Sequence, residues 1–173
     1  MIVDWCLDHE ATVVSVDAPC GWSQTGSSRL AEQELALSGR KIHCFATPTR
    51  ERAVNHDKGF YDWVFNGERL YRLLMNNYPL FKGERRKGPA CIETFPHAIT
   101  CAMAGRVVLA RPKGKMRRNA LQSEGYDIGI LTNIDFVDAA LCAVAADEFR
   151  KDNYLPFGNP EEGYIVVPRC RAR

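Results

Sequence analysis

The sequence lacks any apolar run that approaches the roughly 20 residues needed to cross a membrane, and no basic segment followed by an apolar one opens the chain. It also lacks a strong net charge: 23 lysines and arginines face 21 aspartates and glutamates. Such a balance does not by itself predict nucleic-acid binding, so the distribution of charge matters more than its sum. These absences predict a cytoplasmic protein that is neither secreted nor embedded in a membrane.

Two kinds of site are also missing. The seven cysteines form no Cys-x-x-Cys pair and mostly lie in apolar runs such as LCAVAA, which predicts reduced core residues rather than a disulfide framework. No glycine-rich loop ends in Lys-Ser or Lys-Thr, which argues against a P-loop enzyme, and no histidines stand at metal-ligand spacing. Any catalytic chemistry must therefore come from other side chains.

The apolar segments predict a single α/β domain over residues 1–173, with 46% hydrophobic and 25% charged residues. The β-branched run at residues 12–16 is apolar on both faces, as is typical of a central strand covered by helices on each side. A second buried strand is expected at residues 90–95 and an extended segment at residues 164–167.

Helices are expected where apolar residues recur at helical spacing: residues 1–10, 29–38, 60–77, 97–104 and 133–150. A further short helix should follow the basic residues near 113–118 and end at Gly125. In the helix at 60–77, Trp63, Leu70 and Leu74 are predicted to face the core. Residues 40–58 and 155–163 lack periodicity and are predicted to be loops.

Carboxylates at the edges of apolar segments are the main functional signal. Asp17 ends the first strand, Glu93 lies in the second, and Asp135 and Asp138 are three residues apart at the start of the last helix. Carboxylates gathered at one sheet edge repel each other unless divalent cations separate them, and their oxygens suit Mg²⁺ or Mn²⁺. Each also has a simpler explanation: Asp17 can brace a turn, Asp135 can complement a helix dipole, and Glu93 can pair with an arginine.

Several motifs in order resemble the bacterial and archaeal family called domain of unknown function four-hundred-twenty-nine, over about residues 11–168. They are VVSVDAPCGW, the pair Arg29 and Glu32, CIETFPH, KGKMRRNALQSEG, IDFVDAALCAVAA and EEGYIVVP. The resemblance implies a nuclease with a ribonuclease H-like fold, in which helices flank a mixed sheet and an acidic cluster lies at one sheet edge. The residues that match the family's acidic positions are Asp17, Glu93, Asp135 and Asp138.

The sequence departs from this pattern at its beginning. The ribonuclease H-like fold opens with three antiparallel strands, the first of which supplies a metal-binding aspartate, but only residues 1–11 precede the strand at 12–16. The expected fold is therefore a ribonuclease H-like mixed sheet without its opening antiparallel strands. A downstream start, a decayed gene copy and a protein that works without these strands all explain the departure. In the last case an exposed sheet edge favours a homo-oligomer.

These observations predict a nuclease that hydrolyses phosphodiesters by a two-metal mechanism, with Mg²⁺ or Mn²⁺ held by Asp17, Glu93, Asp135 and Asp138. The residues predicted to contact nucleic acid are basic: Arg29, Lys115, Arg117 and Arg118. The alternative is a non-catalytic binding or assembly module that keeps the fold without the complete metal site. A small-molecule phosphohydrolase or nucleotide binder would use the same carboxylates and also stays open.

Overall fold

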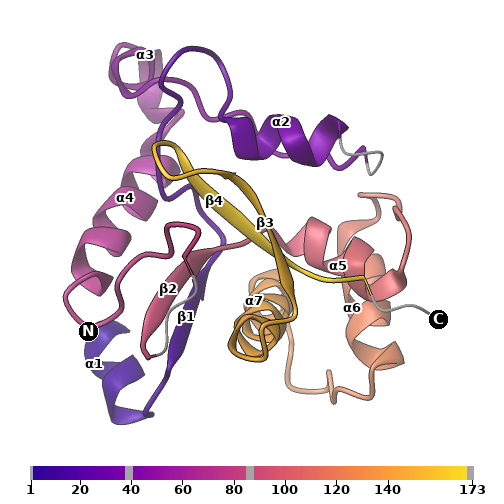
Figure 1. Ribbon diagram of the computed structural model, residues 1–173. Coiled ribbons are helices and arrows are strands. Elements are labelled where there is room, and N and C mark those ends of the chain that lie inside the picture. The colour runs from indigo at the N-terminus through magenta and orange to yellow at the C-terminus, as the bar shows by residue number, and fades with distance from the viewer. Residues whose placement is uncertain (1, 38–40, 85–87, 171–173) are drawn as a thin grey trace.

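The computed structural model describes residues 2–37, 41–84 and 88–170. The elements of the first half are α1 (Ile2–Asp8), β1 (Val13–Val16), α2 (Leu30–Leu37), α3 (Arg50–Val54), the 3-10 helix η1 (Asp57–Gly59), α4 (Asp62–Leu74) and β2 (Ala90–Glu93). The second half contains α5 (Pro96–Ala104), α6 (Lys113–Ser123), α7 (Ile134–Arg150), β3 (Tyr154–Asn159) and β4 (Gly163–Pro168) (Figure 1). Helices thus separate β1 from β2 and β2 from β3, in keeping with the α/β prediction.

The four strands form one mixed sheet in the order β1-β2-β4-β3. β1, β2 and β4 run parallel, and β3 and β4 form an antiparallel hairpin. Val16 of β1 pairs with Glu93 of β2, and Glu93 in turn pairs with Ile165 of β4. The carboxyl ends of the parallel strands therefore meet at one edge of the sheet, the place where open α/β sheets bind ligands.

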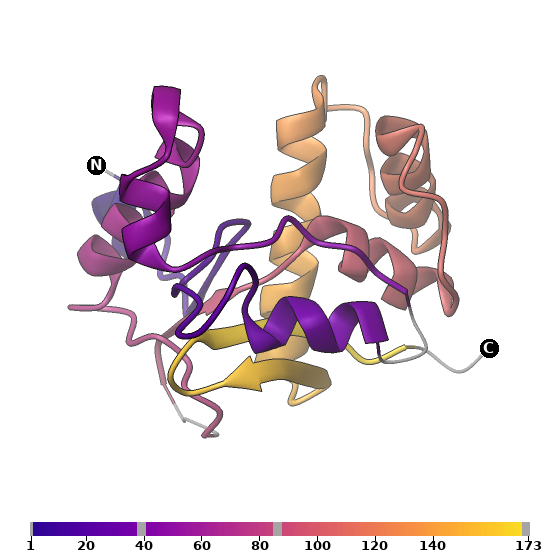
Figure 2. The ribbon, with the colours of Figure 1, turned by 90° about the horizontal axis from the view of Figure 1, so that it is seen from above.

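Helices cover both faces of the sheet (Figures 1 and 2). α1 and α4 pack on one face, where Cys6, Tyr71 and Leu74 contact Val16 and its neighbours. α7 lies on the other face, where Phe149 packs in the cluster that also contains Ile92 and Val166. This alternation explains why β1 and β2 are apolar on both faces, since successive side chains of a strand point to opposite sides.

Local sequence accounts for several helix ends. Asn133 caps α7, because its side-chain oxygen accepts a hydrogen bond from the Phe136 N–H at 2.9 Å. Pro96 occupies the first turn of α5, and Gly105 ends the helix in a left-handed conformation with φ of 64°. Thr49 caps the short helix α3. The helices predicted near 97–104 and 133–150 are thereby confirmed.

Four sequence predictions are wrong in detail. The predicted loop at 40–58 contains α3 and η1 in its described part, and the predicted loop at 155–163 is mostly strand β3, because Pro156 and Gly158 are tolerated on an edge strand. The strand at 12–16 lies at an edge of the sheet rather than in its centre. Trp63, predicted in the core, is 39% exposed. The predicted end of the second helix at residue 38 lies outside the described residues.

Candidate functional site

Asp17 lies immediately after β1, at the carboxyl edge of the sheet. Because side chains alternate along a strand, Asp17 faces the opposite side from Val16 and so faces α7. It lines a groove of about 620 Å³ together with Asp135 and Asp138 of α7. The structure therefore brings together three of the four carboxylates that the sequence singles out.

The environment of Asp17 makes its negative charge costly. Desolvation raises the pKa of its carboxyl from 3.8 to about 6, and the charges of Asp138 and, more weakly, Glu93 add to the increase, whereas Arg117 and Lys113 oppose it. Asp17 is exposed, yet it lines the groove, whose walls desolvate part of its carboxyl. Asp17 makes no hydrogen bond or ion pair with a residue in the described ranges, so its charge lacks a direct partner there.

Asp138 is buried in the second turn of α7, and its carboxylate already forms ion pairs with two basic side chains. Arg117 of α6, itself 7% exposed, donates to its Oδ1, and the Lys113 Nζ lies 3.1 Å from its Oδ2. Asp135, one turn earlier, is exposed. Two cations thus face three carboxylates around Asp17, which leaves the group one negative charge in excess when all are ionised.

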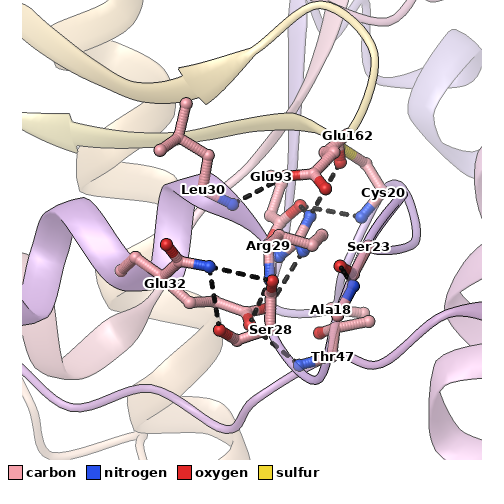
Figure 3. Close-up of polar contacts among 12 residues, drawn as sticks. Ala18, Cys20, Ser23, Ser28, Arg29, Leu30, Glu32, Thr47, Glu93 and Glu162 are labelled. Carbon is pink, nitrogen blue, oxygen red and sulfur yellow. Dashed lines mark hydrogen bonds and ion pairs between the residues drawn. The ribbon is translucent and has the colours of Figure 1, made fainter.

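Glu93 lies in a different environment, shown in Figure 3. Arg29 holds it in a bidentate ion pair, with Nη1 donating to Oε2 at 2.8 Å and Nη2 donating to Oε1 at 2.5 Å. The Cys20 N–H also donates to Oε2 at 2.7 Å. Both carboxylate oxygens of Glu93 therefore accept hydrogen bonds. The simpler explanation of Glu93, a pair with an arginine, matches these contacts.

Arg29 is also the centre of a wider buried network. Its Nε donates to Glu32 Oε1 at 2.9 Å, and the second oxygen of Glu32 accepts from the Arg29 and Thr47 N–H groups at 3.1 and 2.8 Å. Burial lowers the pKa of the Arg29 guanidinium, but the Glu93 charge outweighs burial and holds that pKa well above its ordinary value. Arg29 is 1% exposed, so the prediction that it contacts nucleic acid disagrees with its position.

Glu162, in the turn between β3 and β4, extends the same network. Its Oε1 accepts from the Gln24 N–H and its Oε2 accepts from the Leu30 N–H, both at 2.7 Å. Leu30 begins α2, so this carboxylate satisfies an N–H that the helix cannot pair internally. The sequence analysis includes Glu162 only within the motif EEGYIVVP and does not single it out, because no local pattern points to a partner 132 residues away.

The other predicted nucleic-acid contacts differ in exposure. Lys115 is exposed on α6, whereas Arg117 is buried against Asp138 and therefore is not available in this arrangement. Arg118 is half-buried and donates from Nη1 to the Leu131 carbonyl at 2.5 Å. Lys113, which the sequence analysis placed only in a basic cluster, is exposed by half beside Asp138 and becomes a better candidate for a phosphate contact.

Aromatic side chains lie on the other side of Asp17. Phe45 and Trp63 line a small recess of about 70 Å³ that also includes Asp17 and Glu93. Their ring centroids are 5.0 Å apart in an edge-to-face arrangement, and both rings are partly exposed, at 42% and 39%. An exposed aromatic pair of this kind offers a surface on which a planar ring can stack.

The carboxylates do not form the metal site of four ligands that the sequence predicts. In the described residues, no group of three or more histidine, cysteine, aspartate or glutamate side chains is arranged to hold a metal ion. Asp17, Asp135 and Asp138 line the same groove, and the prediction that they bind Mg²⁺ or Mn²⁺ stays a prediction. The ligand role of Glu93 stays a prediction, and it requires Arg29 to move.

Comparison with known proteins identifies one family. The family model described as protein of unknown function (DUF429) matches residues 1–162. No curated protein and no solved structure matches the chain. Among the described helices, none is both long and apolar enough to span a membrane.

Proposed function

The chain belongs to the family of proteins of unknown function DUF429, and we propose that it is a divalent-cation-dependent nuclease of ribonuclease H-like type. One observation carries the proposal. Asp17 lies at the carboxyl end of β1, its pKa is raised to about 6, and Asp138 contributes to that increase. A cation between the two carboxylates would relieve both the desolvation and the repulsion.

The donor set supports one ion rather than two. Asp17 and Asp138 would hold it, and Asp135 would bind one of its water molecules, while Glu93 stays with Arg29. When bound, Mg²⁺ or Mn²⁺ lowers the pKa of a coordinated water and offsets the charge of a phosphodiester. Arg117 fixes the Asp138 carboxylate, and the exposed Lys113 can turn from Asp138 to a phosphate oxygen.

Two features beside Asp17 support nucleic acid as the substrate class. Lys113 and Lys115 are exposed near the start of α6, where they can neutralise phosphates. Phe45 and Trp63 lie on the other side of Asp17 and can stack an unpaired base. A single strand that crosses Asp17 could use both, so single-stranded substrates are the first to test.

The proposal is tested by a cleavage assay on single-stranded RNA, single-stranded DNA and an RNA–DNA hybrid, each with Mn²⁺ or with EDTA. The chain should cleave at least one substrate only with Mn²⁺, and Asp17→Asn should reduce the rate by about 100-fold or more because it removes a metal ligand. Asp57→Asn, an exposed change in η1 outside the groove, is the matched control and should retain the rate. Cleavage that persists in EDTA or in Asp17→Asn would overturn the proposal.

A second candidate is a binding module that has the fold without catalysis. Two of the predicted metal ligands already form ion pairs, which favours the binding module. Glu93 pairs with Arg29, and Asp138 pairs with Arg117 and Lys113, so basic side chains already neutralise both carboxylates. Binding of a nucleic acid without cleavage of any substrate, equally in Mn²⁺ and EDTA, would support this candidate over the nuclease.

A further inference from the structure

A second cavity lies at the end of α5, and its lining differs from that of the groove beside Asp17. It has a volume of about 210 Å³ and lies between α5 and the segment that follows β4. In Figures 1 and 2 the chain passes beside α5 after β4 ends. Cys101 and Cys170, which are distant in the sequence, both line this cavity. The fold thus brings two free thiols to one enclosed space.

Neighbouring residues hold each of the two cysteines in place. Cys101 lies in the last turn of α5 and is 4% exposed, and its Sγ accepts a hydrogen bond from the Val108 N–H at 3.5 Å. Cys170 is exposed and comes shortly after the end of β4. The residue before it is anchored, because the Arg169 N–H donates to the Asn153 carbonyl at 3.1 Å. One thiol is therefore buried and the other is open to solvent beside the same cavity.

Exposure distinguishes Cys170 from the cysteines outside the cavity. These all lie in the described ranges and are buried or half-buried: Cys6, Cys20, Cys44, Cys91 and Cys142. Burial raises the pKa of the half-buried Cys44 thiol to about 12, so this thiol is a poor nucleophile at neutral pH. Cys170 is therefore the thiol that an oxidant in solution reaches first, and Cys101 is the thiol that shares its cavity.

A histidine beside Cys101 can take up the proton of its thiol. His97 precedes Cys101 by one helical turn, and its Nε2 lies 3.9 Å from the Cys101 Sγ. Desolvation and, after it, the charge of Arg117 lower the pKa of His97, so its imidazole is neutral at pH 7 and able to accept a proton. Burial raises the pKa of the Cys101 thiol, so this thiol needs such a base before it can attack another sulfur.

Basic side chains around the cavity favour an anionic reagent. Arg106 lines the cavity and is exposed, and the exposed Arg169 precedes Cys170. Oxidised glutathione, the small disulfide of reducing cell compartments, carries a net negative charge at pH 7. The two arginines should therefore attract it to the cavity more strongly than they attract an uncharged disulfide.

We propose that Cys101 and Cys170 form a reversible disulfide by exchange with oxidised glutathione, which ties the end of β4 to α5. The Cys170 thiolate attacks one sulfur of oxidised glutathione, so a mixed disulfide forms and one glutathione thiolate leaves. The Cys101 thiol gives its proton to the His97 Nε2, and its sulfur attacks the Cys170 sulfur and expels the second glutathione thiolate. The leaving thiolates take up the protons that the two cysteines release. Two protein thiols are thereby oxidised, and one oxidised glutathione is reduced to two thiols.

The link would act on stability rather than on the site beside Asp17. Both cysteines are free in this structure, as the sequence predicts, so the link is a response to oxidant. It closes a long loop that contains α6 and α7, and it should stabilise the fold by restricting the unfolded chain. The proposal is independent of the proposed nuclease activity, because His97, Cys101 and Cys170 line neither the groove nor the recess beside Asp17.

The test treats the reduced full chain with oxidised glutathione in EDTA and maps its peptides by mass spectrometry without reduction. We expect the Cys101 peptide joined to the Cys170 peptide, no retained glutathione, and a melting temperature raised by about 5–15 °C that dithiothreitol reverses. Added salt should slow the reaction of oxidised glutathione but not that of the uncharged hydroxyethyl disulfide, because salt screens the arginines. Equal salt dependence of the two reagents would overturn the choice of an anionic disulfide.

Variants separate the two steps of the exchange. Cys101→Ser should retain one glutathione on Cys170, Cys170→Ser should form neither adduct nor link, and the control Cys44→Ser should behave as wild type. His97→Gln should form the mixed disulfide at an unchanged rate but resolve it at least about tenfold more slowly, because it lacks the base; unchanged resolution would overturn the role of His97. Glutathione retained on wild-type Cys170, a link to Cys44 or to a second chain, or no reaction would overturn the proposal. If a serine variant does not fold, the peptide map of the wild type decides.

Discussion

Replacing Arg29 by methionine separates a structural role from a ligand role for Glu93. Arg29, Glu93 and Glu32 are 1%, 4% and 5% exposed, and the guanidinium contacts both carboxylates. Methionine keeps much of the side-chain volume but leaves two buried carboxylates without a cation. Breaking a buried ion pair from one side costs about 3–5 kcal/mol, because the remaining charge is uncompensated.

The control is the same substitution at Arg50, whose pair with Glu68 is at the surface. Arg50 is 52% exposed and its Nε lies 3.2 Å from Glu68 Oε1, so Arg50→Met should cost about 0–1 kcal/mol. Urea unfolding followed by circular dichroism measures both changes. For a domain of this size, Arg29→Met should also lower the melting temperature by about 6–20 °C.

A double variant tests the cause. Adding Glu93→Gln to Arg29→Met removes one of the two uncompensated charges and should recover part of the lost stability. If Arg29→Met lowers the unfolding free energy no more than Arg50→Met does, the buried network does not exist as described. Glu93 would then be free to bind a metal. If the double variant is less stable than Arg29→Met alone, uncompensated charge is not the reason for the loss.

Three further predictions concern stability. The pKa of Asp17 rises from 3.8 unfolded to about 6 folded, so its charge destabilises the fold above pH 6 and not below pH 4. Asp17→Asn should therefore exceed wild type in unfolding free energy by about 1 kcal/mol at pH 7, after solvent screening, and the excess should vanish near pH 4; a constant difference contradicts this. Glu162→Gln leaves either the Gln24 or the Leu30 N–H without an acceptor and should cost about 1–3 kcal/mol in urea unfolding; an unchanged midpoint contradicts this. Asn133→Ala removes the cap of α7 and should cost about 1 kcal/mol, against no measurable loss for the exposed Asn119→Ala.

The sequence predicts the helices and parallel strands well, because their signals are local. The cap at Asn133, the proline and glycine around α5 and the β-branched run of β1 act within a few residues of themselves. The β3 strand was missed because Pro156 and Gly158 normally interrupt strands, and only a position at the sheet edge makes them acceptable.

The place of β1 in the sheet shows a limit of the same reasoning. A strand that is apolar on both faces indicates that helices cover both faces. α4 and α7 cover the two faces of β1. The pattern contains no information on whether a neighbouring strand lies along each edge. A two-sided apolar strand can therefore stand at an open edge when a groove continues beside it.

The candidate site was predicted in part. Asp17, Asp135 and Asp138 line one groove, because the carboxyl end of β1 and the first turns of α7 meet at the same sheet edge. The burial of Arg29 depends on Glu93, 64 residues further along the chain, and no local pattern distinguishes a buried arginine from a phosphate-binding one. The same holds for Arg117 and Asp138, which are 21 residues apart.

The measurement that tests the metal site most directly is a calorimetric titration with Mn²⁺ in metal-free buffer. Wild type and the control Asp57→Asn should bind one equivalent with the same affinity, whereas Asp17→Asn should bind at least about tenfold more weakly, because its amide does not supply the charge that holds the ion beside Asp138. No heat of binding in any of the three proteins, or equal binding by all three, would contradict a cation site built on Asp17.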